Sequence, residues 1–254
     1  MEANKVVCMD NLEFMKTLPS ENIDLIYGDI LFGTGKKFKD YQDLKPDKNV
    51  IEDFYIPRIK EMYRVLKNNG SIYLQMDYRI NHWIRYILDE IFGENNFVNE
   101  IIWQYYMGGK GKKEFAKKHD TILFYCKNKG SHTFNQFKVK RYLDFIPSLK
   151  DDSKDANTGH DKIGYYSTVV CPDVWSSIKS VFNMSNEYVN YNTQKPLALM
   201  ERIIKASSNE GDLVGDFFMG SGSFIVKAKE LNRNYIGCDI NPKAVEITNL
   251  RLTS

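Results

Sequence analysis

The segment from Asp212 to Asp239 constrains the fold of this chain most. A β-prone run that ends at Asp216 leads into the glycine turn Gly220-Ser221-Gly222, and a helix-forming stretch separates this turn from a second β-prone run that ends at Asp239. Glycine lets a ligand approach the backbone closely and tolerates positive φ. This order predicts a nucleotide-binding βαβ unit with an acidic residue at the end of its second strand.

The acidic residues of this unit indicate which nucleotide it takes. Asp239 lies 17 residues after Gly222, where a carboxylate can accept hydrogen bonds from both ribose hydroxyls. Asp216 stands where the pyrophosphate of a dinucleotide would lie, and the turn lacks the third glycine of the dinucleotide fingerprint. An NAD-dependent oxidoreductase is therefore disfavoured. An anion at this place suits a cationic amino acid group, which favours S-adenosylmethionine as the cofactor.

Hydrophobic periodicity elsewhere predicts one large α/β domain. A buried strand over residues 22–27 would deliver Asp29 to its carboxyl end, the edge at which open α/β sheets bind ligands. Asn241 is a candidate N-cap with Pro242 in the first helical turn. The patterns predict further strands over residues 71–76, 98–106, 121–126 and 213–216, and helices over residues 50–66, 78–92, 197–207 and 242–250.

Composition excludes several classes of protein. The 254 residues are 43% hydrophobic, which suffices for a sizeable core, and no apolar run approaches the roughly 20 residues of a bilayer span. The N-terminus carries no secretory signal, so we expect a cytoplasmic protein without a membrane partner. The four cysteines form no C-x-x-C pair and the four histidines no H-E-x-x-H motif. We therefore expect no metal and no disulfide, and four buried thiols.

Residues 107–190 read as an insert, because periodic alternation weakens there, and residues 151–161 read as a mobile polar loop. Between residues 104 and 141 the chain has ten Lys and Arg residues against two Asp and Glu residues, interleaved with aromatics. Such a mixture suits phosphates and unstacked bases, although a solvated lysine-rich face over buried strand aromatics is the alternative interpretation. The candidate DNA-binding residues are Tyr105, Tyr106, Lys110, Lys112, Lys113, Lys117 and Lys118.

Three motifs in a fixed order resemble those of the beta-class amino DNA methyltransferases, which modify adenine N6 or cytosine N4. The first is the turn Asp29-Ile30-Leu31-Phe32, which matches the family's D-P-P-[YF]. The second is Thr193-Gln194-Lys195-Pro196, which matches T-Q-K-P, and the third is the stretch from Asp216 to Gly222, which matches D-P-F-x-G-S-G. The resemblance implies a Rossmann-like, S-adenosylmethionine-dependent methyltransferase sheet with helices on both faces and a permuted motif order. Residues 1–106 and 191–254 would form the catalytic and cofactor-binding domain, and 107–190 the target-recognition region.

The resemblance also implies a role for each matching residue. Asp29 and the carbonyl of Ile30 would accept hydrogen bonds from the exocyclic amine of a flipped base, with Leu31 in the same catalytic turn, and Phe32 would stack on that base. A second group of residues would hold the cofactor. In it, Lys195 would border the methionine carboxylate and Asp239 would bind the ribose hydroxyls. This group comprises Asp10, Asn11, Asp29, Lys195, Asp216, Phe218, Gly220, Gly222 and Asp239.

The chain departs from the family at three prolines, which Ile30, Leu31 and Phe217 replace. Proline fixes φ and removes a backbone donor, so its loss could loosen a turn that has to orient a base. We expect an active adenine-N6 enzyme acting on double-stranded DNA, because the family's adenine enzymes usually begin this turn with Asp and its cytosine-N4 enzymes with Ser. The alternatives are a cytosine-N4 enzyme, a methyltransferase acting on RNA or on a protein glutamine, and a catalytically weak relic that binds DNA and cofactor. A cognate restriction endonuclease and a second copy of the chain are further candidate partners.

Overall fold

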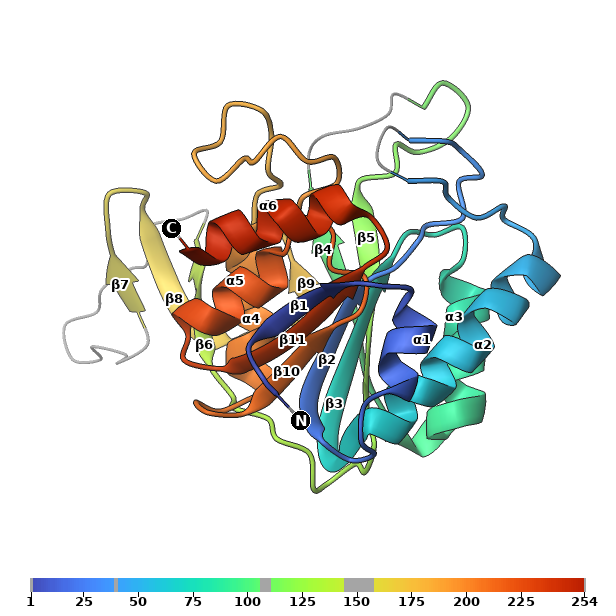
Figure 1. The fold of residues 1–254 in the computed structure, drawn as a ribbon. Coiled ribbons are helices and arrows are strands. Elements are labelled where there is room, and N and C mark those ends of the chain that lie inside the picture. The colour runs from blue at the N-terminus through green and yellow to red at the C-terminus, as the bar shows by residue number, and fades with distance from the viewer. Residues whose placement is uncertain (1, 39–40, 106–110, 144–157, 254) are drawn as a thin grey trace.

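An eight-stranded sheet forms the centre of the protein in a computed structural model that describes residues 2–38, 41–105, 111–143 and 158–253 (Figure 1). Its strands lie in the order β1-β11-β10-β2-β3-β5-β4-β9. The neighbours from β1 to β3 are parallel, whereas β5 is antiparallel to both β3 and β4. In this order the strands span Lys5–Cys8, Asn234–Asp239, Leu213–Asp216, Ile23–Asp29, Leu66–Met76, His119–Cys126, Phe97–Gln104 and Val174–Trp175.

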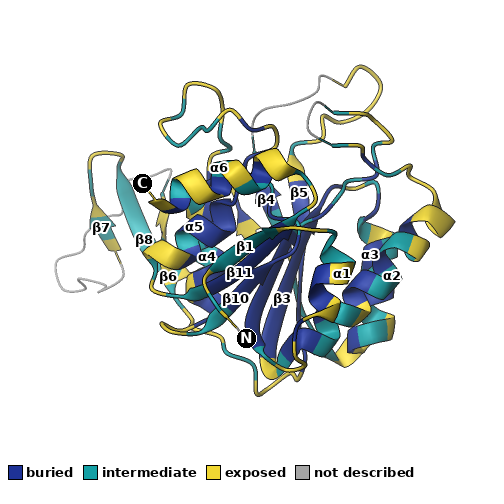
Figure 2. Cartoon of the chain, in the orientation of Figure 1, coloured by how far each residue is buried: buried dark blue, intermediate teal, exposed yellow. Residues whose placement is uncertain are grey.

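Helices cover both faces of this sheet, as the sequence predicts (Figure 1). One apolar cluster joins the sheet to α1 (Asn11–Lys16), α2 (Lys48–Val65) and α3 (Asn81–Phe92), and a short 3-10 helix, η1 (Glu94–Asn96), follows. A second cluster joins the other face to α4 (Leu197–Ser207), α5 (Ser223–Glu230) and α6 (Pro242–Thr253). Burial is concentrated in the strands between the two helical layers (Figure 2). The expected α/β fold is thereby confirmed.

Most of the predicted elements are present, with shifted ends. Asp47 caps α2 by accepting hydrogen bonds from the amides of Asn49 and Val50 at 3.0 and 3.2 Å, and Asn241 accepts one from the amide of Lys243 at 3.0 Å. The helix predicted to end at residue 66 ends at Val65, but the strand predicted from residue 71 already begins at Leu66. The helix predicted from residue 78 begins only at Asn81.

The interval 107–190 is structurally mixed. It contributes β5 and β9 to the central sheet, and β6 (Lys138–Tyr142), β8 (Tyr165–Val170) and β7 (Thr158–His160) form a separate antiparallel sheet in the order β6-β8-β7. Of the predicted loop over residues 151–161, residues 158–160 are β7 instead, and residues 151–157 lie outside the described residues. The target-recognition role of this interval stays a prediction.

Two further expectations concern cysteines and membranes. Cys126 and Cys238 are buried, but Cys171 is only partly buried and Cys8 is exposed, so the expectation of four buried thiols is wrong. Cys8 ends β1, which lies at the edge of the sheet. Among the described residues, no helix is long and apolar enough to cross a bilayer.

The order of the strands reverses between β10 and β2, and this reversal positions the site. From β10 the chain continues through α5 to β11 on one side, whereas from β2 it continues through α2 to β3 on the other. Asp216 pairs in register with Tyr27, so Asp29 lies two residues further along the neighbouring strand. Two aspartates that are far apart in the sequence therefore meet at the switch point, where open α/β sheets bind ligands.

Candidate active site

A cavity of about 310 Å³ lies at the carboxyl ends of β10, β2 and β11. It brings together all but one of the residues predicted for catalysis and cofactor binding, namely Asp10, Asn11, Asp29, Ile30, Leu31, Phe32, Lys195, Asp216, Phe218, Gly220 and Asp239. Gly222 is the residue that does not line it. A Cβ at Gly222, where φ is +73°, would lie 2.3 Å from Oγ1 of Thr248, so close packing with α6 already requires glycine there. A cofactor contact of Gly222 stays a prediction.

Asp29 is the last residue of β2, and its two carboxylate oxygens are used differently. Oδ2 forms an ion pair with Nζ of Lys195, whereas Oδ1 is buried and has no hydrogen-bond partner among the described residues. The side chain is only 18% exposed. Burial raises the pKa of the Asp29 carboxyl to about 6, although the neighbouring Lys195 acts to lower it. Asp29 thus lines the cavity with Oδ2 bound by Lys195 and Oδ1 unpaired but buried.

The turn after Asp29 is held by hydrogen bonds from two neighbouring elements. The amide of Ile30 donates to the carbonyl of Gln75 in β3 at 3.1 Å, and the Ile30 side chain is buried in the core. The hydroxyl of Tyr55 in α2 donates to the carbonyl of Leu31 at 3.0 Å. Sheet and helix therefore fix both residues that stand where the family usually has proline.

Asp43 holds the next part of the loop, and sequence reasoning missed it. Its buried carboxylate accepts hydrogen bonds from the amides of Gly33 at 3.1 Å, Thr34 at 2.8 Å and Leu44 at 2.8 Å. An aspartate ten residues beyond the turn carries no local signature of this role. Tyr41, Tyr191 and Thr193 also line the cavity without having been predicted.

The carboxylates on the glycine-turn side of the cavity are buried and partly satisfied. Asp216 is 2% exposed, and its Oδ1 accepts a hydrogen bond from the amide of Phe218 at 3.0 Å. Burial and the nearby carboxylates of Asp29 and Asp239 raise the pKa of Asp216 well above its usual range. Oδ2 of Asp239 accepts from the amide of Gly220 and Oδ1 from the amide of Asn241, each at 2.8 Å. Burial also raises the pKa of Asp239.

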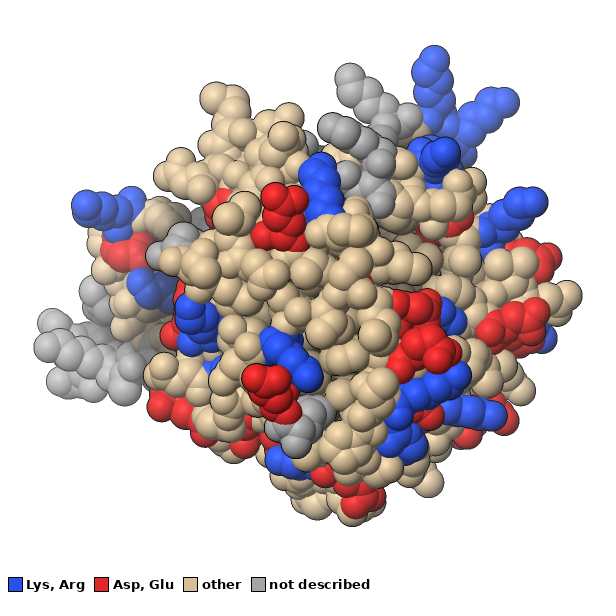
Figure 3. All heavy atoms as spheres, in the orientation of Figure 1, with Lys and Arg blue, Asp and Glu red and all other residues tan. Residues whose placement is uncertain are grey.

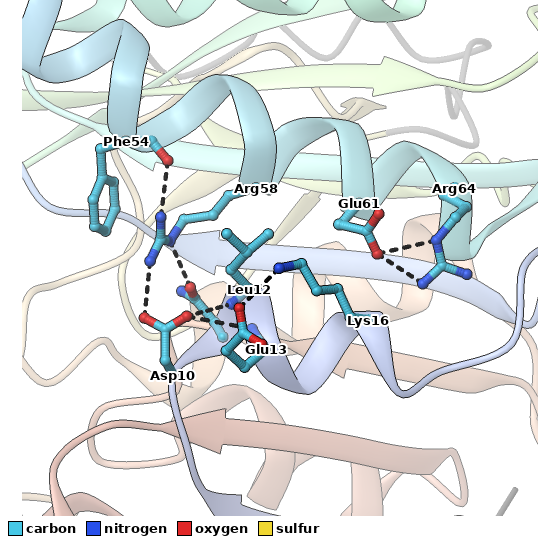
Figure 4. Close-up of polar contacts among 9 residues, drawn as sticks. Asp10, Leu12, Glu13, Lys16, Phe54, Arg58, Glu61 and Arg64 are labelled. Atoms are coloured by element: carbon cyan, nitrogen blue, oxygen red, sulfur yellow. Dashed lines mark hydrogen bonds and ion pairs between the residues drawn. The ribbon is translucent and has the colours of Figure 1, made fainter.

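Arg58 in α2 binds Asp10, one of the residues that line the cavity (Figure 4). It donates from Nε to Oδ1 of Asn11 at 2.7 Å and from Nη2 to Oδ2 of Asp10 at 2.8 Å, and its guanidinium lies 3.7 Å from the centroid of the Phe54 ring. Asn11 in turn donates to the carbonyl of Phe217 at 2.9 Å. Sequence reasoning missed Arg58, although an arginine among the apolar positions of a helix is itself a signal, because a buried cation requires a partner.

The predicted DNA-binding residues differ in exposure. Lys112 and Lys113 are exposed, whereas Lys117 forms an ion pair with Glu114 and Lys118 is half-buried. The hydroxyl of Tyr105 donates a hydrogen bond to Asp120 at 2.9 Å, so the polar end of this tyrosine is already engaged. Tyr106 and Lys110 lie outside the described residues.

The loop that carries these lysines leaves the sheet at the edge where the cavity lies. Gln104 at the end of β4 pairs with His119 at the start of β5, and the next strand, β3, ends at Met76 opposite Thr121. Gln75 pairs with Asp29 in the strand beyond. Figure 3 shows basic side chains projecting from the upper right of the molecule, over the loops that follow β2 and β4 in Figure 1.

Comparison with known proteins gives a consistent result. The model of the N6/N4 methyltransferase family, described as DNA methylase, matches residues 23–250. The chain is 33% identical to the type II methyltransferase M.HpaI of Haemophilus parainfluenzae, over 98% of this chain and 74% of that protein. It is 31% identical to the DNA adenine methyltransferase YhdJ of Escherichia coli, over 99% and 83%.

Solved structures agree on the fold. The crystal structure of an M1.HpyAVI complex with S-adenosylmethionine has a TM-score of 0.66 and 25% identity, over 98% of this chain and 99% of that one. The cytosine-N4-specific PvuII DNA methyltransferase has a TM-score of 0.71 at 17% identity, over 99% of this chain and 86% of that one. The predicted Rossmann-like methyltransferase sheet is thereby confirmed.

Proposed function

This chain belongs to the N6/N4 amino DNA methyltransferases, enzymes of the restriction-modification type that use S-adenosylmethionine, and we propose that it methylates the N6 amine of adenine in double-stranded DNA. The carboxylate of Asp29 carries this proposal, because a largely buried acceptor in the cavity that Phe32 also lines suits an amine on a flipped base. An aspartate at the head of the turn and the similarity to YhdJ, a DNA adenine methyltransferase, favour adenine over cytosine.

The cavity has the groups that this cofactor needs. Asp216 is a buried carboxyl group with one backbone hydrogen bond, and a cationic amino acid group would stabilise its charged form. Each Asp239 oxygen accepts one backbone hydrogen bond, and a carboxylate oxygen has a second lone pair for a ribose hydroxyl. The Asp10 and Asn11 pair, fixed by Arg58, would border the adenine.

The chemistry that follows is mainly positioning. The amine of adenine is a weak nucleophile because its lone pair is delocalised into the ring. The carboxylate of Asp29 and the carbonyl of Ile30 would bind its two N–H groups and so favour a tetrahedral nitrogen with an available lone pair. When bound, S-adenosylmethionine supplies the electrophilic methyl group, whose bond to sulfur breaks as the bond to nitrogen forms. The nitrogen then loses a proton, which the carboxylate of Asp29 would accept.

The test is methylation of duplex DNA in cells that express this chain, followed by base-resolution mapping of modified bases. We expect N6-methyladenine within one short sequence, and none when Asp29→Asn is expressed. Mapping of N4-methylcytosine instead would refute the adenine assignment. Binding of DNA and cofactor without any methyl transfer would show that the chain is a catalytically inactive relic. Methylation of RNA or of a protein glutamine without modified DNA would refute DNA as the substrate. A cognate endonuclease, a homodimer and a cytoplasmic location stay predictions.

A further inference from the structure

Lys195 contacts the proposed catalytic carboxylate directly. Its Nζ forms an ion pair with Oδ2 of Asp29 and also donates to the carbonyl of Thr193 at 3.3 Å. The Lys195 side chain is only 10% exposed, and Nζ lies 5.3 Å from the centroid of the Phe32 ring. The resemblance to the family places this lysine beside the methionine carboxylate, which leaves the contact with Asp29 without an assigned purpose.

Hydrogen bonds fix the residues on both sides of Lys195 and so hold its side chain beside Asp29. The side chain of Gln194 donates to the carbonyl of Glu187 at 2.6 Å and accepts from the amide of Val189 at 2.9 Å. The carboxylate of Glu187 accepts from the amide of Leu197 at 3.0 Å, at the start of α4. Hydrogen bonds on both sides thus hold the segment that delivers Lys195.

We propose that Lys195 is a positioning residue that keeps Asp29 ionised and, by binding its Oδ2, fixes the rotation of the carboxylate. This inference rests on the proposed function for its catalytic meaning. Without Lys195, either carboxylate oxygen could turn toward the base, and a protonated Asp29 would present a donor where an acceptor is needed. The lysine would therefore fix both the charge and the rotation of the carboxylate.

The charges around Asp29 explain why such a residue is needed. Asp120 disfavours a charged Asp29, and burial acts more strongly in the same direction. The phenols of Tyr27, Tyr41 and Tyr55 also face this carboxylate, and burial raises the pKa of each above its usual value, so they stay neutral at pH 7. Among the described residues that shift the pKa of Asp29, Lys195 is the cation. Its removal leaves only influences that favour the protonated acid.

The experiment is a pH titration of the Asp29 carboxyl by ¹³C NMR in the cofactor-free chain, with the signal assigned from its loss in Asp29→Asn. We expect Lys195→Gln to raise the pKa of Asp29 by at least about one unit, equivalent to a tenfold change, and Lys195→Arg to restore most of the wild-type titration. The control is Lys67→Gln, which removes an ion pair to Asp24 at the opposite end of β2. It should leave the Asp29 titration unchanged.

Kinetics provide the second measurement. With DNA and cofactor saturating, the acidic limb of the kcat profile of Lys195→Gln should move to higher pH, with kcat reduced more than KM is changed. An unchanged Asp29 titration with weaker cofactor binding would overturn the inference and leave Lys195 as a cofactor contact only. The titration needs neither DNA nor methyl transfer, so a failure of the proposed function would be recognised separately.

Discussion

The hydroxyl of Tyr55 donates a 3.0 Å hydrogen bond to the carbonyl of Leu31, which joins helix α2 to the turn that follows Asp29. In the family this turn usually contains two prolines, which restrict the backbone covalently. Here Ile30 and Leu31 replace them, and contacts with α2 and β3 restrict the same peptides. Tertiary hydrogen bonds therefore compensate for the loss of the two prolines from this turn.

Tyr55→Phe tests this compensation. Because the ring stays and only the hydroxyl is lost, we expect the free energy of unfolding to fall by about 1 kcal/mol. Turnover should fall by a larger factor than cofactor affinity, since we propose that this turn orients the base. Chemical denaturation, calorimetric cofactor binding and a methyl-transfer assay provide the three values. Unchanged turnover would show that this bond has no part in orienting the turn.

Ile30→Pro restores the family residue and should nevertheless destabilise this chain. Proline has no amide to donate to the carbonyl of Gln75, and it would replace a side chain that is buried in the core. We expect a loss of about 2–4 kcal/mol in the free energy of unfolding, against about 1 kcal/mol for the control Ile30→Val. Equal stability of the two variants would contradict the role assigned to the Ile30 amide.

The parts of the site that could be predicted from the sequence are those at strand ends. Asp29, Asp216 and Asp239 each close a β-prone run, and parallel strands bring such ends to one edge. Asp43 and Arg58 were missed because the contacts that tie them to the site join residues 9 to 48 positions apart. Residues 121–126 were predicted as a strand, but their place between β3 and β4 depends on long-range register, which local periodicity does not encode.

Arg58→Lys should weaken cofactor binding. A lysine keeps the charge but cannot contact Asp10 and Asn11 at once through the planar guanidinium. We expect the Kd for S-adenosylmethionine to rise by about tenfold, or about 1.4 kcal/mol, by calorimetry. Arg64→Lys is the control, because Arg64 lies further along α2 and binds Glu61 instead (Figure 4). The same loss in both variants would indicate a general effect on the helix.

The raised pKa of Asp29 predicts an acidic limb in the activity profile. Below pH about 6 the carboxylate protonates and loses its acceptor, so kcat/KM should fall about tenfold per pH unit. A profile that stays flat down to pH 5 would argue against Asp29 as the acceptor.

The Asp29 carboxyl should make activity rise with pH and stability fall with pH. Its folded pKa of about 6 exceeds the ordinary value of 3.8, so its stabilising contribution is complete below pH about 4 and is lost as the pH rises through 6. The difference in unfolding free energy between wild type and Asp29→Asn should therefore shrink by about 3 kcal/mol across this window. Denaturation at several pH values measures it, and a difference that grows with pH would be the wrong sign.

Replacing Lys112 and Lys113 together by Ala should weaken DNA binding. Both side chains are exposed on the loop that leaves the sheet beside the cavity, so we expect them to contact phosphates and not to support the fold. The slope of log K against log salt should flatten by about two units, with affinity lost about equally across DNA sequences. Fluorescence anisotropy at several salt concentrations measures this. The control is Lys16→Ala with Lys205→Ala, which removes the same charge from exposed ion pairs on α1 and α4. If both double variants lose the same affinity, net charge and not this loop determines binding.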